Sequence, residues 1–153
     1  MAAAVIPANL PPAVRDETLD LFFGRWLGSG QYRDVYVYSP DETKVVKIER
    51  NARSFSNVSE WQIWQEVKDT KWARYFAACS SISHSGSVLV MERTRPLERA
   101  PTQLPNFMAD LKTENFGRVG SRIVCHDYGI SNLMWRGLTA ARMTKVNPKD
   151  FPL

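Results

Sequence analysis

The sequence predicts an α+β fold in which an antiparallel sheet with one main helix precedes a smaller C-terminal part. Runs of β-branched and aromatic residues at 26–38, 44–50 and 82–92 alternate with short turns, as in antiparallel hairpins. Between the second and third of these runs, residues 56–68 carry apolar side chains at helical spacing. With 153 residues, the chain is long enough for one domain with a hydrophobic core.

Composition and charge narrow the function classes. Hydrophobic residues make up 44% of the chain, which is typical of globular rather than disordered proteins. The net charge is only +4 and no block of consecutive basic residues occurs, so a nucleic-acid partner is not expected. Cys79 and Cys125 lack a Cys-x-x-Cys spacing, and no apolar run is long enough to span a membrane. We therefore expect a reduced, cytoplasmic protein with no membrane partner.

The N-terminal segment is expected to lie outside the sheet. Residues 1–12 hold three prolines among small residues and predict an extended tail. Residues 13–23 predict a helix that ends at Gly24. The first hairpin follows that helix.

A glycine-rich turn lies inside this hairpin. Gly28, Ser29 and Gly30 stand between two β-type runs, and Val35 follows seven residues after Gly28. Without a Cβ, such a turn lets backbone N–H groups approach phosphate oxygens, and the valine can pack on a flat ring. Arg33 occupies the place of a third glycine in such loops. An ordinary hairpin turn is the alternative interpretation.

Lys47 lies within the apolar strand at 44–50 and needs a carboxylate or phosphate partner if it is buried. On the predicted helix at 56–68, Glu60 falls near the middle of the apolar face and Glu66 falls to one side of it. Glu60 is the first candidate for the ion pair with Lys47. Glu66 remains the alternative.

The strand at 87–92 leads into a polar segment that is prone to turn, where backbone groups near Met91 could contact a nucleotide base. The other predicted elements are an N-cap at Ser56 or Asn57, a helix from Asp69 to Ala78, a short helix from Pro105 to Leu111 and a loop from Glu114 to Gly120.

The last pattern is a polar loop between apolar runs at 123–135. Asp127 ends the first run, and Asn132 follows five residues later as the second run begins, which predicts strand, loop and strand. In such a loop, the aspartate can orient a hydroxyl group and the asparagine can bind a metal ion. A turn rich in Asp and Asn between two buried strands is the alternative.

In this order, the patterns resemble the protein-kinase-like superfamily. They are most similar to the small early host-takeover protein kinases of short-tailed bacteriophages. The resemblance covers residues 26–148. The stretches that carry it are Leu27-Gly28-Ser29-Gly30, Val45-Val46-Lys47, Asp127 to Met134 and Lys145-Val146-Asn147-Pro148.

The resemblance implies a single minimal kinase-like domain at 13–153, with an antiparallel-sheet N-lobe at about 24–92 and a strongly reduced C-lobe at about 97–153. It implies three catalytic residues, Asp127, Lys47 and Asn132. The implied nucleotide-binding residues are Gly28, Ser29, Gly30, Val35, Lys47, Glu60 and Met91. Metal binding would use Asn132 together with Asn147 or Asp150.

The implied function is ATP- and Mg²⁺-dependent phosphoryl transfer to Ser or Thr of host proteins in the host cytoplasm. Lys47 and Asp127 should then lie in one cleft. Cys125 and His126 differ from the His-Arg pair that precedes the kinase aspartate, and Asn147 is a neutral residue where a metal-binding aspartate is expected. The alternative is therefore a catalytically impaired kinase-like protein that binds and inhibits a host protein.

Overall fold

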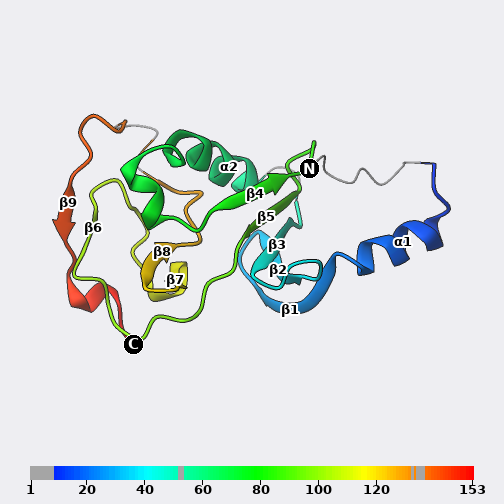
Figure 1. Ribbon diagram of the computed structural model, residues 1–153, viewed down its shortest axis with the longest axis horizontal. Helices are drawn as coiled ribbons and strands as arrows, with labels where there is room; N and C mark the ends of the chain where they lie inside the picture. Colours follow the sequence, from blue (N-terminus) through cyan, green and yellow to red (C-terminus); the bar gives the residue numbers. More distant parts are fainter. Residues whose placement is uncertain (1–8, 52–53, 132, 134–136) are drawn as a thin grey trace.

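The computed structural model describes residues 9–51, 54–131, 133 and 137–153. Its main feature is a five-stranded antiparallel sheet with the strand order β1-β2-β3-β5-β4 (Figure 1). The predicted α+β fold with an antiparallel sheet is confirmed. The strands are β1 (Phe23–Ser29), β2 (Arg33–Tyr38), β3 (Lys44–Glu49), β4 (Cys79–Ile82) and β5 (Val88–Glu92).

The pairing register of the central strands determines which side chains share a face of the sheet. Val35 of β2 pairs with Lys47 of β3, and Val37 pairs with Val45. Val45 also pairs with Met91 of β5. Because directly opposed residues project to the same side, these five side chains lie on one face.

Helix α2 (Ser56–Val67) lies beside the sheet (Figure 1). The predicted cap at Ser56 or Asn57 is wrong, because the helix begins at Ser56 and Phe55 precedes it with a φ of 53°. The Glu49 carboxylate accepts the backbone N–H of Asn57 at 2.7 Å and so satisfies one free donor of the first turn. The buried face of the helix follows the expected spacing and consists of Asn57, Glu60, Ile63 and Val67.

Two short strand pairs and two 3₁₀ helices make up most of the C-terminal part, and a further 3₁₀ helix, η1, lies between α2 and β4. The β7–β8 hairpin lies below α2 in Figure 1, and the β6–β9 pair lies at the end opposite to α1. The elements are η1 (Lys71–Tyr75), β6 (Gln103–Pro105), η2 (Thr113–Asn115), β7 (Phe116–Val119), β8 (Arg122–Cys125), β9 (Met143–Lys145) and η3 (Pro148–Asp150).

One cluster of buried side chains joins the sheet and α2 to this C-terminal part. Phe76 is at its centre, with its ring 4.9 Å from that of Tyr128 and 5.9 Å from that of Phe107. Leu89 and Met91 reach the cluster from the sheet, and Ile63 and Val67 reach it from α2. The face of the sheet that carries Leu89 and Met91 is therefore packed directly against the segments that follow the sheet in the chain.

Two of the expected helices are shorter than predicted. Helix α1 (Pro12–Asp20) ends before residue 23, because Phe23 already pairs with Tyr38 in the sheet. The helix expected from Asp69 to Ala78 is only the 3₁₀ turn η1, since Phe76 enters a bridge with Cys125. The extended tail predicted for 1–12 lies largely outside the described residues, and Pro12 already belongs to α1.

Two other predictions are wrong because each of these segments contains part of a strand that pairs with another strand. The helix expected at 105–111 is not formed: Pro105 ends β6, the buried Phe107 follows in a turn, and Met108 forms a bridge with Ser131. The loop expected at 114–120 instead contains β7. The second strand predicted at 123–135 falls mainly outside the described residues.

No helix in the described ranges is both long and apolar enough to cross a membrane.

Candidate functional site

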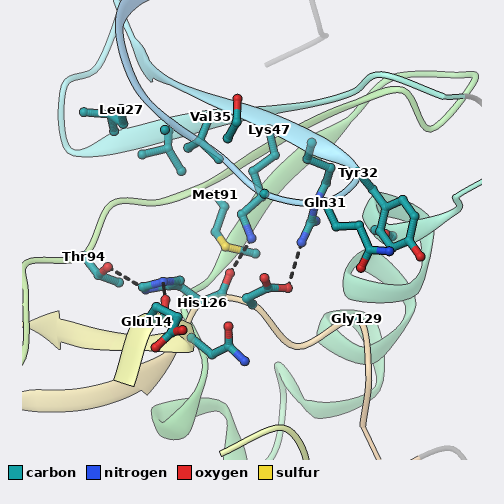
Figure 2. A pocket seen from close by; sticks show the side chains of 18 of the residues that line it. Leu27, Gln31, Tyr32, Val35, Lys47, Met91, Thr94, Glu114, His126 and Gly129 are labelled. Carbon is teal, nitrogen blue, oxygen red and sulfur yellow. Dashed lines mark hydrogen bonds and ion pairs between the residues drawn. The ribbon is translucent and has the colours of Figure 1, made fainter. Parts of the chain in front are cut away.

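A cleft of about 850 Å³ lies between the sheet and the segments around the β7–β8 hairpin. Figure 2 shows Leu27, Val35 and Met91 on the sheet side and His126 on the opposite side. The polar part of the lining includes the glycine-rich turn, Arg33, Lys47, Asp110, Lys112, Glu114, Asn115, His126 and Asp127. Lys47 and Asp127 lie in this one cleft, as expected from the sequence.

Lys47 forms a buried ion pair with Glu60. Its Nζ lies 3.1 Å and 3.0 Å from the two carboxylate oxygens. Strand β3 presents Lys47 to this face, and α2 presents Glu60 from its buried side. Glu66 is exposed on the same helix, so Glu60 is the partner and the alternative is wrong.

The Glu60 carboxylate accepts hydrogen bonds from several donors. Besides Lys47, it accepts both terminal guanidinium nitrogens of Arg33, at 2.7 Å and 2.9 Å, and the backbone N–H of Tyr128, at 3.1 Å. Burial by itself would raise the pKa of the Glu60 carboxyl, but Lys47 and Arg33 outweigh it and lower this pKa to about 2. Glu60 is therefore ionised at neutral pH.

Arg33 also reaches Asp127, whose Oδ1 lies 2.8 Å from the second guanidinium nitrogen. The pKa of Arg33 is raised, because attraction by Glu60 outweighs the effect of burial. The expectations for the turn concerned its glycines and left Arg33 without a role. Strand alternation is the signal for it, since Arg33 precedes Val35 by two residues and shares its face of β2.

His126 connects the sheet side of the cleft to the opposite wall. Its Nδ1 lies 2.7 Å from Thr94 Oγ1, its Nε2 lies 2.8 Å from the backbone oxygen of Glu114, and its own backbone oxygen accepts Lys47 Nζ. Burial, and then the charge of Lys47, lower the pKa of His126. The imidazole is therefore neutral at pH 7.

Asp110 and Asn115 form a second polar pair on the wall facing the sheet. Asn115 Nδ2 donates to the backbone oxygen of Asp110 at 2.8 Å and to its carboxylate at 3.0 Å. Lys112 Nζ lies 2.9 Å from the other carboxylate oxygen, and this hydrogen bond lowers the pKa of Asp110. The backbone oxygen of Asn115 accepts the N–H groups of His126 and Asp127, at 2.9 Å and 3.3 Å. This pair is thus joined directly to the Asp127 segment.

The sequence-based expectations missed Asp110 and Asn115, although a signal was present. Asn115 follows Asp110 by five residues, the same interval that singled out Asp127 and Asn132. The interval alone cannot choose between the two pairs. The fold brings Asp110, Asn115 and Asp127 to one cleft.

The predicted site residues fall into three groups. Gly28, Ser29, Gly30, Val35, Lys47, Met91 and Asp127 line the cleft, and Glu60 lies behind Lys47. Asn132 lies outside the described residues. Asn147 and Asp150 do not line the cleft, because they follow β9 at its pairing with β6, and Asn147 instead accepts the backbone N–H of Lys149. Metal binding by these three residues stays a prediction.

The chemistry available in the cleft is that of carboxylates, amides and cations. Burial raises the pKa of Cys79 to about 12 and also raises that of Cys125, so both thiols are protonated at neutral pH. Within the described ranges, no group of three or more His, Cys, Asp and Glu side chains could hold a metal ion by itself. Two carboxylates and an amide suit a hard cation that a phosphate ligand also coordinates.

Comparison of the chain with family models, curated proteins and solved structures gives no match.

Proposed function

We propose that the chain is a small protein-kinase-like phosphotransferase that uses ATP and Mg²⁺ to phosphorylate Ser or Thr of a host protein, similar to the early host-takeover kinases of bacteriophages. The observation that carries the proposal is the buried Lys47–Glu60 pair, which lies under a glycine-rich turn in the same cleft as Asp110, Asn115 and Asp127. These groups follow one another in the chain in the order typical of protein kinases.

The cleft supports a register of the kinase motifs that differs from the one expected from the sequence. Asp110-Leu111, followed by Asn115, fits the Asp-Leu-x-x-x-Asn part of the catalytic loop. Asp127-Tyr128-Gly129, after the β7–β8 hairpin, fits Asp-Phe-Gly with Tyr in place of Phe. In this register, Asp110 takes the role of orienting the acceptor hydroxyl, and Asp127 moves from that role to metal binding.

The residues present fit a nucleotide with its metal ion. A volume of about 850 Å³ lies within the range of small-molecule pockets. Leu27, Val35, Val45 and Met91 supply an apolar wall for a flat base. Asn115 and Asp127 would hold Mg²⁺, which neutralises charge on the phosphates when bound.

The two glycines of the turn add support. Neither Gly28 nor Gly30 has a positive φ, and a Cβ at either position would meet no atom of the described residues within 4 Å, its chain neighbours aside. Neither local conformation nor internal packing therefore requires glycine at these positions. Close approach of a ligand to the backbone gives a reason for both.

The protein side chains would act mainly by positioning and by electrostatics. Glu60 fixes the ammonium of Lys47 at the centre of the cleft, where it can contact phosphate oxygens. Asn115 and Lys112 fix the carboxylate of Asp110, which remains accessible to accept a hydrogen bond from a hydroxyl group. The acceptor Ser or Thr would be oriented by this carboxylate.

The second candidate function is a catalytically impaired kinase-like protein that binds and inhibits a host protein. One observation favours it: Arg33 already occupies the Asp127 carboxylate that the proposed chemistry assigns to a metal ion. The two candidates share the cleft and differ in phosphoryl transfer, because the inhibitory protein does not require a nucleotide.

A set of variants tests the proposal through melting temperature and transfer of radiolabelled phosphate from ATP. Mg²⁺ with ATP should raise the melting temperature of the wild type, and Lys47→Ala should abolish the rise. Asp110→Asn should lose phosphoryl transfer but keep this rise, whereas Asp127→Asn should lose both. Asp69→Asn, at an exposed position just after α2, is the control and should behave as the wild type.

Each outcome separates the candidates. If Asp127→Asn loses transfer but keeps metal-dependent binding, Asp127 is the acceptor-orienting residue and the register proposed here is wrong. ATP binding by a wild type that transfers no phosphate would support the inhibitory protein. Absence of any ATP effect at millimolar concentration would contradict the phosphotransferase and leave an inhibitory protein that acts without nucleotide.

A further inference from the structure

The Arg33 side chain reaches from the sheet to the opposite wall of the cleft. Arg33 begins β2 just after the glycine-rich turn, and only 10% of its side chain is exposed. One guanidinium nitrogen lies 2.7 Å from Glu60, and the other lies 2.9 Å from Glu60 and 2.8 Å from Asp127. The first nitrogen also lies 3.2 Å from Asn57 Oδ1. These contacts fix the plane of the guanidinium group between three segments of the chain.

Glu60 has a counter-ion without Arg33, because Lys47 contacts both of its oxygens. Asp127 differs from Glu60 in this respect. Among the ion pairs of the described residues, its partner is Arg33, and its side chain is 52% exposed. Arg33 is therefore the second cation on Glu60 and the cation that neutralises Asp127.

We infer that Arg33 is a positioning residue that holds Asp127 when no metal ion is bound and that competes with a divalent metal ion for the Asp127 carboxylate. The inference rests on the proposed function, in which Asp127 binds Mg²⁺. A guanidinium group and a divalent cation on one carboxylate repel each other, so metal binding to Asp127 favours release of its Oδ1 from Arg33. Arg33 keeps its fork on Glu60 when Asp127 departs. Breaking the contact between Arg33 and Asp127 therefore lowers the affinity for the metal ion, but it does not lower the affinity for metal-free ATP.

Replacing the guanidinium group by an amide tests the competition. Arg33→Gln removes the charge and keeps a polar side chain that can bond Glu60. The Mg²⁺ concentration that gives half of the ATP-dependent rise in melting temperature should fall by up to about fivefold, the effect of one lost, partly exposed ion pair. Affinity for ATP in EDTA, measured by calorimetry, should not increase.

Two further variants control for charge and folding. Arg25→Gln makes the same charge change at an exposed position of β1 and should leave the Mg²⁺ midpoint unchanged. Arg33→Lys keeps a cation for Glu60, but a single ammonium lacks the fork that spans Glu60 and Asp127. Its Mg²⁺ midpoint should lie between those of the wild type and Arg33→Gln, and it serves as the test if the glutamine variant does not fold.

Manganese without nucleotide separates this inference from the proposed function. Weak binding of Mn²⁺ to the Asp127 carboxylate is enough to broaden the backbone amide NMR signal of Asp127. This broadening should occur at a lower concentration in Arg33→Gln than in the wild type, even if neither protein binds ATP. Equal Mn²⁺ concentrations, or no broadening in either protein, would overturn the competition. An Mg²⁺ midpoint that rises in Arg33→Gln while ATP still binds would also overturn it, because Arg33 would then assist the loaded site.

Discussion

At the scale of single residues, the buried charges around Glu60 dominate the molecule. Two cations depend on this one carboxylate, and all three side chains are buried. The sequence could predict Glu60 because a carboxylate within an apolar helix face needs a cationic partner. Arg33 was missed, because the resemblance assigns a glycine to that position, although strand alternation places it on the same face as Val35.

Glu60→Gln should therefore lower the free energy of unfolding by about 3 to 5 kcal/mol, the cost of leaving buried cations without their partner. Glu66→Gln on the same helix is the matched control and should change it by less than about 0.5 kcal/mol, because Glu66 is exposed. Urea denaturation measures both. Equal effects of the two substitutions would contradict the buried network.

His126 should make stability depend on pH. The pKa of His126 is lowered in the folded protein, so below about pH 6.5 the unfolded chain binds a proton that the folded one does not. The contribution of His126 to the free energy of unfolding is complete above pH 6.5. It is lost as the pH falls towards the pKa that His126 has in the folded protein. The free energy of unfolding should therefore fall between pH 7 and pH 5, by at most about 1.4 kcal/mol per pH unit from this group.

The two histidines of the chain provide the control for this dependence. His126→Gln should flatten the pH profile of urea unfolding between pH 7 and pH 5. His84→Gln should leave it unchanged, because His84 is exposed in the β4–β5 turn. If only His84→Gln flattens the pH profile, the pH dependence of unfolding does not come from His126 and the prediction is wrong.

At the scale of elements, the strands of the main sheet were predicted from the sequence more successfully than strands that pair with distant segments. The hairpins β1–β2 and β4–β5 and the strand β3 have local alternation and short turns, which the sequence displays. Strand β6 has only three residues and pairs with β9, with Gln103 opposite Lys145. No local pattern encodes that pairing. Prediction therefore failed at 105–111, next to β6. The failure at 114–120 has a different cause, because β7 pairs with the adjacent β8 but its segment carries Gly117 and Gly120 and so resembles a loop.

The junction between β7 and the segment after β5 should be sensitive to one methyl group. A Cβ on Gly117 would lie 2.5 Å from Thr94 and 2.8 Å from the backbone oxygen of Arg95, and backbone cannot move away cheaply. Gly117→Ala should lower the free energy of unfolding by about 1 to 3 kcal/mol. Thermal and urea unfolding measure this loss.

Gly28→Ala in the glycine-rich turn is the matched comparison, because a Cβ there meets nothing within 4 Å. It should leave stability within about 0.5 kcal/mol of the wild type and should weaken ATP binding. A loss of stability as large as that of Gly117→Ala would mean that the turn needs glycine for folding and not for a ligand.

At the scale of the whole molecule, the cleft depends on contacts between its two walls. Arg33 and Lys47 extend from the sheet to Asp127 and His126, which follow β8. The sequence predicted that Lys47 and Asp127 share a cleft, because each is a polar group at an apolar run. It could not choose between two Asp-to-Asn intervals, because that choice depends on how the β7–β8 hairpin folds back towards the sheet.

The C-terminal end of the chain should stabilise the wall that carries Asn115. The Phe151 ring is buried and lies 5.1 Å from that of Phe116, the residue that follows η2, and Thr113 of η2 donates a hydrogen bond to the backbone oxygen of Pro152 at 2.9 Å. Phe151→Ala should therefore lower the free energy of unfolding by about 3 to 5 kcal/mol. It should also weaken ATP binding measured well below the melting temperature, because η2 holds one side of the cleft.

Leu153→Ala is the control for this last prediction, because Leu153 lies two residues further on and is exposed. It should change the free energy of unfolding by less than about 0.5 kcal/mol and leave ATP binding unchanged. If Phe151→Ala destabilises the protein but binding is retained, the C-terminal end supports the core without positioning the cleft wall. If both substitutions have small effects, the packing of Phe151 on Phe116 does not contribute to stability in solution.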